Sequence, residues 1–93
     1  MNKGDLIDVV AEKTHLSKKQ AELAISATID TIMDAVSHDQ KVTLVGFGSF
    51  ERRARKAREG RNPKTHQKMM IPATEVPAFS AGKLFKEKVS PGK

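Results

Sequence analysis

A run of arginines and lysines at residues 51–68 is the part of this 93-residue sequence best suited to chemistry, namely the binding of a polyanion. The run, ERRARKAREGRNPKTHQK, holds eight basic residues and two glutamates, and this difference of six equals the +6 net charge of the whole chain. Residues 1–41 are net negative and residues 69–93 carry only a small positive charge. A solvated basic loop that aids solubility is the alternative, but solubility requires no such clustering. The segment therefore indicates a nucleic-acid-binding surface.

Catalytic and metal-binding chemistry has little support in the sequence. The chain has no cysteine, and His15, His38 and His66 are too scattered for local metal-ligand spacing. The glycine-rich stretch GFGSF at 46–50 lacks the lysine and the spacing of a phosphate-binding P-loop. We therefore expect no enzymatic activity, no metal, no cofactor and no small-molecule substrate.

The length of the chain indicates a single domain, residues 1–93, that is marginally stable alone. A chain of this size buries only about 60 to 65% of its unfolded surface, and without cysteines no disulfide supplements the core. A second chain that shares the core would supply the missing burial. The acidic residues near the N-terminus leave no apolar run for a signal peptide, and no later window reaches membrane-spanning length. We expect a cytoplasmic protein with no membrane partner.

Residues 1–40 are predicted to form a helical hairpin. Asn2 is placed as an N-cap three residues before Asp5, and Ser17 with Gln20 has the spacing of a capping box. The second helix carries an apolar stripe at helical spacing, which we interpret as core: Ala21, Ala24, Ile25, Ile29, Ile32, Met33 and Val36. The two helices share one apolar side.

Strands are expected after residue 40, because KVTLVGFGSF is rich in β-branched and aromatic residues. Gly46 and Gly48 indicate a tight turn or a close approach of two backbone segments. We assign residues 41–52 and 72–80 to the body of a sheet and residues 53–71 to a flexible β-ribbon, here called the arm. Its basic residues occupy both faces of an extended chain, so it must project into solvent.

The arm turns at GRNPKTH, residues 60–66, which we call the tip, and returns through KMMI. Pro72 lacks an N–H, so we expect a ladder break or bulge there that bends the arm. Residues 81–93 are predicted to form a C-terminal helix and a polar tail, with Ser80 as its cap. The fold class is therefore α+β.

Four motifs together resemble one protein family in order and spacing: VGFGSF at 45–50, GRNPKT at 60–65, IPA at 71–73 and VPAFSAGK at 76–83. They are similar to the HU/IHF family of bacterial histone-like DNA-binding proteins, more closely to HU than to IHF. The resemblance covers essentially the whole chain. It implies an intertwined homodimer with a helical base and two long β-ribbon arms that reach into the DNA minor groove.

The resemblance also implies roles for individual residues. Pro63 would intercalate between base pairs and kink the duplex. The other DNA-binding residues would be Lys3, Arg53, Arg55, Arg58, Arg61, Asn62, Lys64, Lys83 and Lys86. Phe47, Phe50 and Phe79 would belong to the dimer core. The implied function is to bend, compact and stabilise the nucleoid with little sequence specificity.

One position departs from the family pattern, since His66 stands where the tip commonly has glycine. A left-handed backbone is less favourable for histidine than for glycine. Two alternatives to the main interpretation remain: a sequence-specific IHF-like DNA bender, and a basic RNA-binding or ribosome-associated protein.

Overall fold

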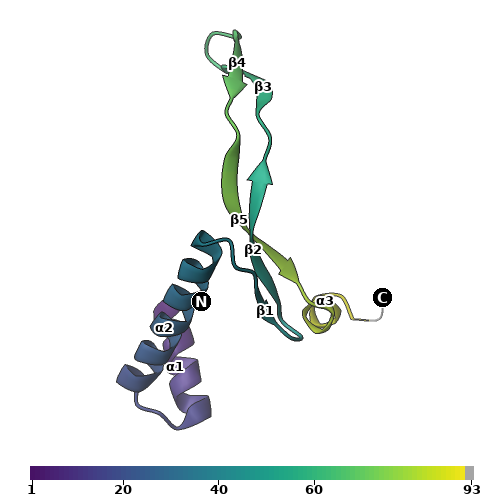
Figure 1. The fold of residues 1–93 in the computed structure, drawn as a ribbon. Coiled ribbons are helices and arrows are strands. Elements are labelled where there is room, and N and C mark those ends of the chain that lie inside the picture. The colour runs from purple at the N-terminus through teal and green to yellow at the C-terminus, as the bar shows by residue number, and fades with distance from the viewer. Residues whose placement is uncertain (92–93) are drawn as a thin grey trace. The chain divides into compact units, whose positions relative to one another are not determined.

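The computed structural model describes residues 1–91 and has an α+β fold with three helices and antiparallel strands. Residues 92 and 93, the end of the predicted tail, lie outside the described residues. The chain divides into two compact units, Met1–Asp34 and Ala35–Lys93, which are described in turn. Figure 1 traces the elements from α1 to α3.

The first unit contains α1 (Lys3–Thr14) and most of α2 (Lys18–Ser37). Asn2 is the N-cap of α1, with reciprocal side-chain bonds between Asn2 and Asp5 of 2.9 and 3.1 Å. The Ser17 hydroxyl accepts the Gln20 N–H and the Gln20 side chain accepts the Ser17 N–H, both at 3.1 Å. Both predicted helix starts are confirmed, because each satisfies N–H groups that a helix leaves unpaired in its first turn.

The core of this unit is small. Ile7, Ala11 and Ala21 are buried, with Val10 and Ile25 packed against them. Of the rest of the predicted apolar stripe, Val36 is buried, but Ile29 and Met33 are exposed within one chain, with exposed fractions of 40% and 63%. The stripe therefore supplies less core to a single chain than its length suggests.

The second unit is built on a three-stranded antiparallel sheet in the order β1-β2-β5: β1 (Val42–Leu44), β2 (Gly48–Arg55) and β5 (Thr74–Ala81). The turn from β1 to β2 needs both its glycines. Gly46 has φ of 85°, in the left-handed region that side chains disfavour. A Cβ on Gly48 would lie 2.5 Å from the carbonyl oxygen of Ser80, which confirms the predicted close approach.

A cluster of four phenylalanines joins the sheet to α3 (Lys83–Val89). The ring centroids of Phe50 and Phe79 are 4.9 Å apart, and Phe47 stacks on Phe85 at 5.4 Å. The prediction that Ser80 caps this helix is wrong, because β5 continues through Ala81 and the N-cap is Gly82. The backbone of Ser80 is held opposite Ser49 in the ladder, so it cannot also begin a helix.

Beyond β2 and β5 the chain continues as the hairpin of β3 (Arg58–Arg61) and β4 (Lys68–Ile71), as Figure 1 shows in teal and green. The ladder is interrupted between Arg55 and Arg58 on one strand and between Ile71 and Thr74 on the other. Pro72 lies in this interruption, so the predicted ladder break is confirmed. Two residues intervene on each strand and the pairing register is unchanged, so the break contains no bulge.

Candidate nucleic-acid interface

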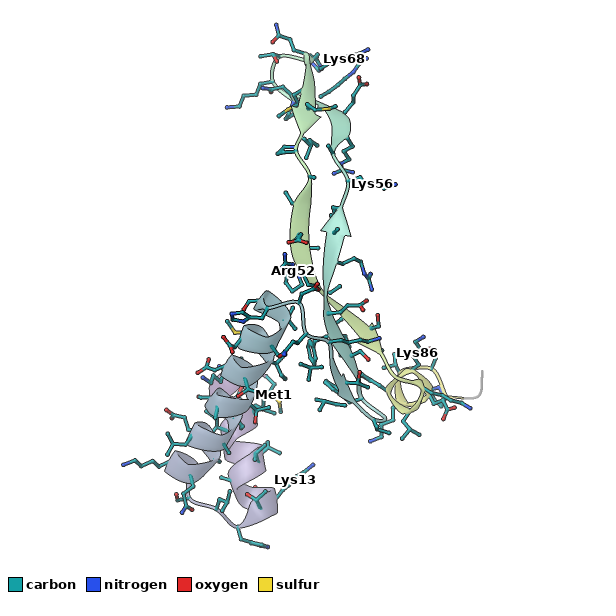
Figure 2. All side chains as sticks on the ribbon, in the orientation of Figure 1. Met1, Lys13, Arg52, Lys56, Lys68 and Lys86 are labelled. Carbon is teal, nitrogen blue, oxygen red and sulfur yellow. The ribbon has the colours of Figure 1, made fainter. Side chains whose placement is uncertain are left out.

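The junction between the sheet body and the arm, which we call the root, consists of residues 52–55 of β2 and residues 74–77 of β5. Its arginines lie on two faces. Arg53 lies opposite Val76 and Arg55 opposite Thr74, whereas Arg52 lies opposite Pro77. Because side chains alternate along a strand, Arg53 and Arg55 share one face and Arg52 shares the other with Phe50. Figure 2 shows side chains along both edges of the arm, with Arg52, Lys56 and Lys68 labelled.

Arg53 is not a free cation in this structure. Its guanidinium donates to the Glu51 carboxylate two residues away, with an N–O distance of 2.7 Å. This hydrogen bond and the charge of Arg53 hold the pKa of Glu51 below its usual value, with a smaller contribution from Lys41. Arg55 is exposed and has no ion-pair partner among residues 1–91. The two arginines therefore share a face but differ in how readily they meet a phosphate.

Toward the tip, the hairpin of β3 and β4 places Arg58 opposite Ile71 and Arg61 opposite Lys68. Gly60 lies under the Ile71 side chain, since a Cβ on Gly60 would come within 2.9 Å of it. Arg58 and Arg61 are exposed, and neither has an ion-pair partner within the described chain. The ribbon thus carries unneutralised cations along its length, as a surface for a polyanion requires.

The tip is organised by Asn62. Its side-chain oxygen accepts the Lys64 N–H at 2.8 Å, its own N–H donates to the Gln67 carbonyl at 3.0 Å, and its carbonyl accepts the His66 N–H at 2.7 Å. An asparagine that bonds the backbone two residues on is a common turn former. Pro63 and Lys64 are both exposed in this turn. The network leaves the rigid ring of Pro63 presented at the end of the arm.

His66 has φ of 58°, so the tip uses the left-handed backbone conformation at the position where the family commonly has glycine. Its N–H bond to the Asn62 carbonyl closes the turn, so the turn is made without glycine there.

The predicted contacts outside the arm lie on helices. Lys83 is the first residue of α3 and Lys86 lies in its last turn; both are exposed. Lys3 is the first residue of α1, is exposed, and belongs to the first unit. The structure brings Arg53, Arg55, Arg58, Arg61, Asn62, Pro63 and Lys64 together on one ribbon. Lys83 and Lys86 lie on α3, which follows the C-terminal end of β5, whereas the arm precedes its N-terminal end.

Sequence reasoning missed one arrangement at the root of the arm. Arg52 forms an ion pair with Glu75 of β5 and also donates to the Ser37 carbonyl at 3.2 Å. The signal that could have found it is the alternation of β2, which places Arg52 on the same side as Phe50 rather than with Arg53.

Within residues 1–91, no group of three or more histidine, aspartate or glutamate side chains is arranged to hold a metal ion. None of the helices in that range is both long and apolar enough to cross a membrane.

Comparison with known proteins identifies the family. The model of the family described as bacterial DNA-binding protein matches residues 1–90. The chain is 69% identical to DNA-binding protein HU of Nostoc sp., over 100% of this chain and 99% of that protein. It is 51% identical to DNA-binding protein HU 1 of Bacillus subtilis, over 97% and 98% of the two chains.

Solved structures agree with this assignment. The chain in a cocrystal structure of Anabaena HU with DNA matches with a TM-score of 0.94 and 69% identity, covering 98% of this chain and 99% of that one. HU from Thermotoga maritima matches with a TM-score of 0.70 and 37% identity, covering 97% and 100%. These matches confirm the predicted α+β fold. The predicted absence of enzymatic activity is also confirmed, because it follows from the family itself. The protein therefore belongs to the family of bacterial DNA-binding proteins that includes HU.

Proposed function

We propose that this protein is a histone-like architectural factor that binds double-stranded DNA with little sequence preference, bends it and compacts it. The observation that carries the proposal is the basic ribbon that ends in an exposed proline. Its cations supply a sequence-independent affinity for phosphates. An apolar wedge at the tip supplies the bend, since wedges of this kind kink DNA by about 20 to 90°.

Each part of the arm has its own role in this proposal. Arg53, Arg55, Arg58 and Lys64 follow the phosphates, and Arg61 and Asn62 reach the minor-groove base edges. The side-chain oxygen of Asn62 is already engaged within the tip, so its amide N–H groups are the donors for those edges. The minor groove distinguishes A·T from G·C but little else, which explains the weak sequence preference. Pro63 enters an opened base step.

The whole chain acts as one DNA-binding domain in this proposal, with residues 1–40 and 81–93 as a helical base, 41–52 and 72–80 as the sheet body, and 53–71 as the arm. Lys3, Lys83 and Lys86 bind the DNA that the bend brings onto the base. The protein works in the cytoplasm, bound to the nucleoid.

The working form in this proposal is a homodimer. Phe47 and Phe79 remain 44% and 41% exposed in one chain, although they belong to the phenylalanine cluster. Apolar surface of this extent is normally covered in a stable protein. A second copy that packs on Phe47, Phe50 and Phe79 would cover the cluster and complete a shared core.

The test is end-to-end fluorescence energy transfer on a short duplex labelled at both ends. Two unrelated DNA sequences and an RNA duplex of equal length are titrated with the protein. The proposal expects transfer to rise for both DNAs and not for RNA. A rise for one DNA alone would assign the protein to the sequence-specific benders, and tight RNA binding without bending would assign the arm to RNA.

A further inference from the structure

Arg52, at the root, differs from the arginines of the arm in having its guanidinium held by two partners. One terminal nitrogen forms the ion pair with Glu75, and the other donates to the carbonyl of Ser37 at 3.2 Å. Its side chain is only 33% exposed, and its Nε is buried without a hydrogen-bond partner among the described residues. A guanidinium that is already paired and largely covered is poorly placed to bind a phosphate.

The pairing register explains why Arg52 and Glu75 meet. Arg52 lies opposite Pro77, and Glu75 lies opposite Ala54. The two charged residues are therefore diagonal neighbours on one face of adjacent strands, a distance that long side chains span. The third member of the group is the carbonyl of Ser37, the last residue of α2, and arginine side chains often donate to the last carbonyls of a helix. The guanidinium has the planar fork of donors that such a two-sided contact needs.

The location of this group matters because the ladder stops just beyond it. After Arg55 and Thr74 the strands are unpaired until Arg58 and Ile71. The root is thus the last paired stretch before the interruption. Ion pairs and hydrogen bonds between its side chains limit the direction in which the outer part of the arm projects from the sheet. An isolated two-stranded ribbon has little rigidity of its own.

We propose that Arg52, Glu75 and the Ser37 carbonyl form a clamp that sets the direction of the arm, and that Arg52 is a positioning residue for DNA bending rather than a phosphate contact. The inference deepens the proposed function and rests on it. The clamp sets the degree of bend at saturation and has little effect on affinity.

Glu75→Gln gives the sharpest test, because loss of the negative charge and loss of the clamp affect different quantities. The first changes the DNA affinity, and the second changes the bend. Removing a carboxylate beside a phosphate-binding ribbon favours tighter DNA binding. Loss of the clamp instead lowers the bend, so energy transfer at saturating protein should fall while affinity holds or rises. Glu59→Gln is the matched control, since it removes the same charge from β3 at a residue with no ion-pair partner in residues 1–91. It should leave the bend unchanged.

Arg52→Lys tests the other side of the clamp. Lysine keeps the charge but lacks the fork that reaches both Glu75 and Ser37. The variant should lower the bend as Glu75→Gln does, and the double variant should be no worse than either single one, because both remove the same link. The salt dependence of DNA binding by Arg52→Lys should match that of the wild-type protein. A drop of about 0.9 per arm in the salt slope of Arg52→Ala would instead make Arg52 a phosphate contact and overturn the proposal.

A measurement without DNA separates this inference from the proposed function. In the free full-length protein, amide hydrogen exchange at Arg53 and Val76, which lie opposite each other in the ladder, should be about two- to fivefold faster in Glu75→Gln, as expected for loss of a partly exposed ion pair. Glu59→Gln should not change it. Unchanged exchange together with an unchanged bend would refute the clamp. If the wild-type protein fails to bend DNA at all, the proposed function fails while the exchange result still decides whether the clamp exists.

Discussion

Arg55→Ala is the substitution that most directly measures how the arm binds. Arg55 is exposed on β2 opposite Thr74 and has no ion-pair partner in residues 1–91, so its charge is available to a phosphate. Arg53, on the same face, is already paired with Glu51. A phosphate must replace that carboxylate to bind Arg53, so Arg55→Ala should lose more DNA affinity than Arg53→Ala.

The magnitude follows from counterion release. Each phosphate contact contributes about 0.9 to the slope of log affinity against log salt on duplex DNA. A dimer with two engaged arms loses two contacts, so the slope should become shallower by about 1.8. Raising the salt concentration from about 50 to about 200 mM should then reduce the affinity of the variant about twelvefold less than that of the wild-type protein.

The assay is a fluorescence anisotropy titration at four or five salt concentrations, on two DNA duplexes of unrelated sequence. The control is Lys13→Ala, which removes the same charge from the last turn of α1 at a residue assigned no DNA contact. The slope of Lys13→Ala should equal that of the wild-type protein. An unchanged slope for Arg55→Ala, or a loss of affinity on only one of the two sequences, would refute the reasoning.

Substitutions at three further positions test the tip and the turn. Pro63→Ala should retain most of the affinity and lose much of the bend, measured by energy transfer at saturation; an undiminished bend would make Pro63 a turn residue and no more. His66→Val should weaken the tip by about 1 to 2 kcal/mol, because a β-branched side chain is strained at φ of 58°, whereas His66→Gly should not. Faster hydrogen exchange of the residue 66 amide in the valine variant alone is the expected result, and equal rates in both variants would contradict it. Gly48→Ala should destabilise the fold by about 1 to 3 kcal/mol in chemical denaturation, since its Cβ would lie 2.6 Å from the Phe79 ring; wild-type stability would show that the turn accommodates a methyl group.

Local chemistry explains why much of the fold could be predicted. Each capping box joins residues three apart, Asn2 with Asp5 and Ser17 with Gln20, so no distant contact was needed to foresee it. The left-handed turn at Gly46 is likewise a property of one residue and its neighbours. The basic arm was visible because charge on both faces of a strand excludes a core.

The errors lie where the pairing of distant strands decides the outcome. Ser80 has the side chain of a helix cap, yet the ladder with Ser49 extends β5 to Ala81 and moves the cap to Gly82. Pro72 signalled a break in the ladder, but only the register on both sides of it shows that no extra residue is inserted.

The sequence by itself determined the starts of α1 and α2, the position of the arm and the proline at its tip, because these depend on residues close together in the chain or on charge density alone. Only the tertiary structure decided which arginines are held in ion pairs and which are available to bind a phosphate. Arg52 and Glu75 are 23 positions apart and meet through the register of β2 with β5, whereas Arg53 is paired locally with Glu51 and Arg55 has no such partner in residues 1–91. Register depends on where two strands align around the whole arm, and no single residue type along the arm encodes it.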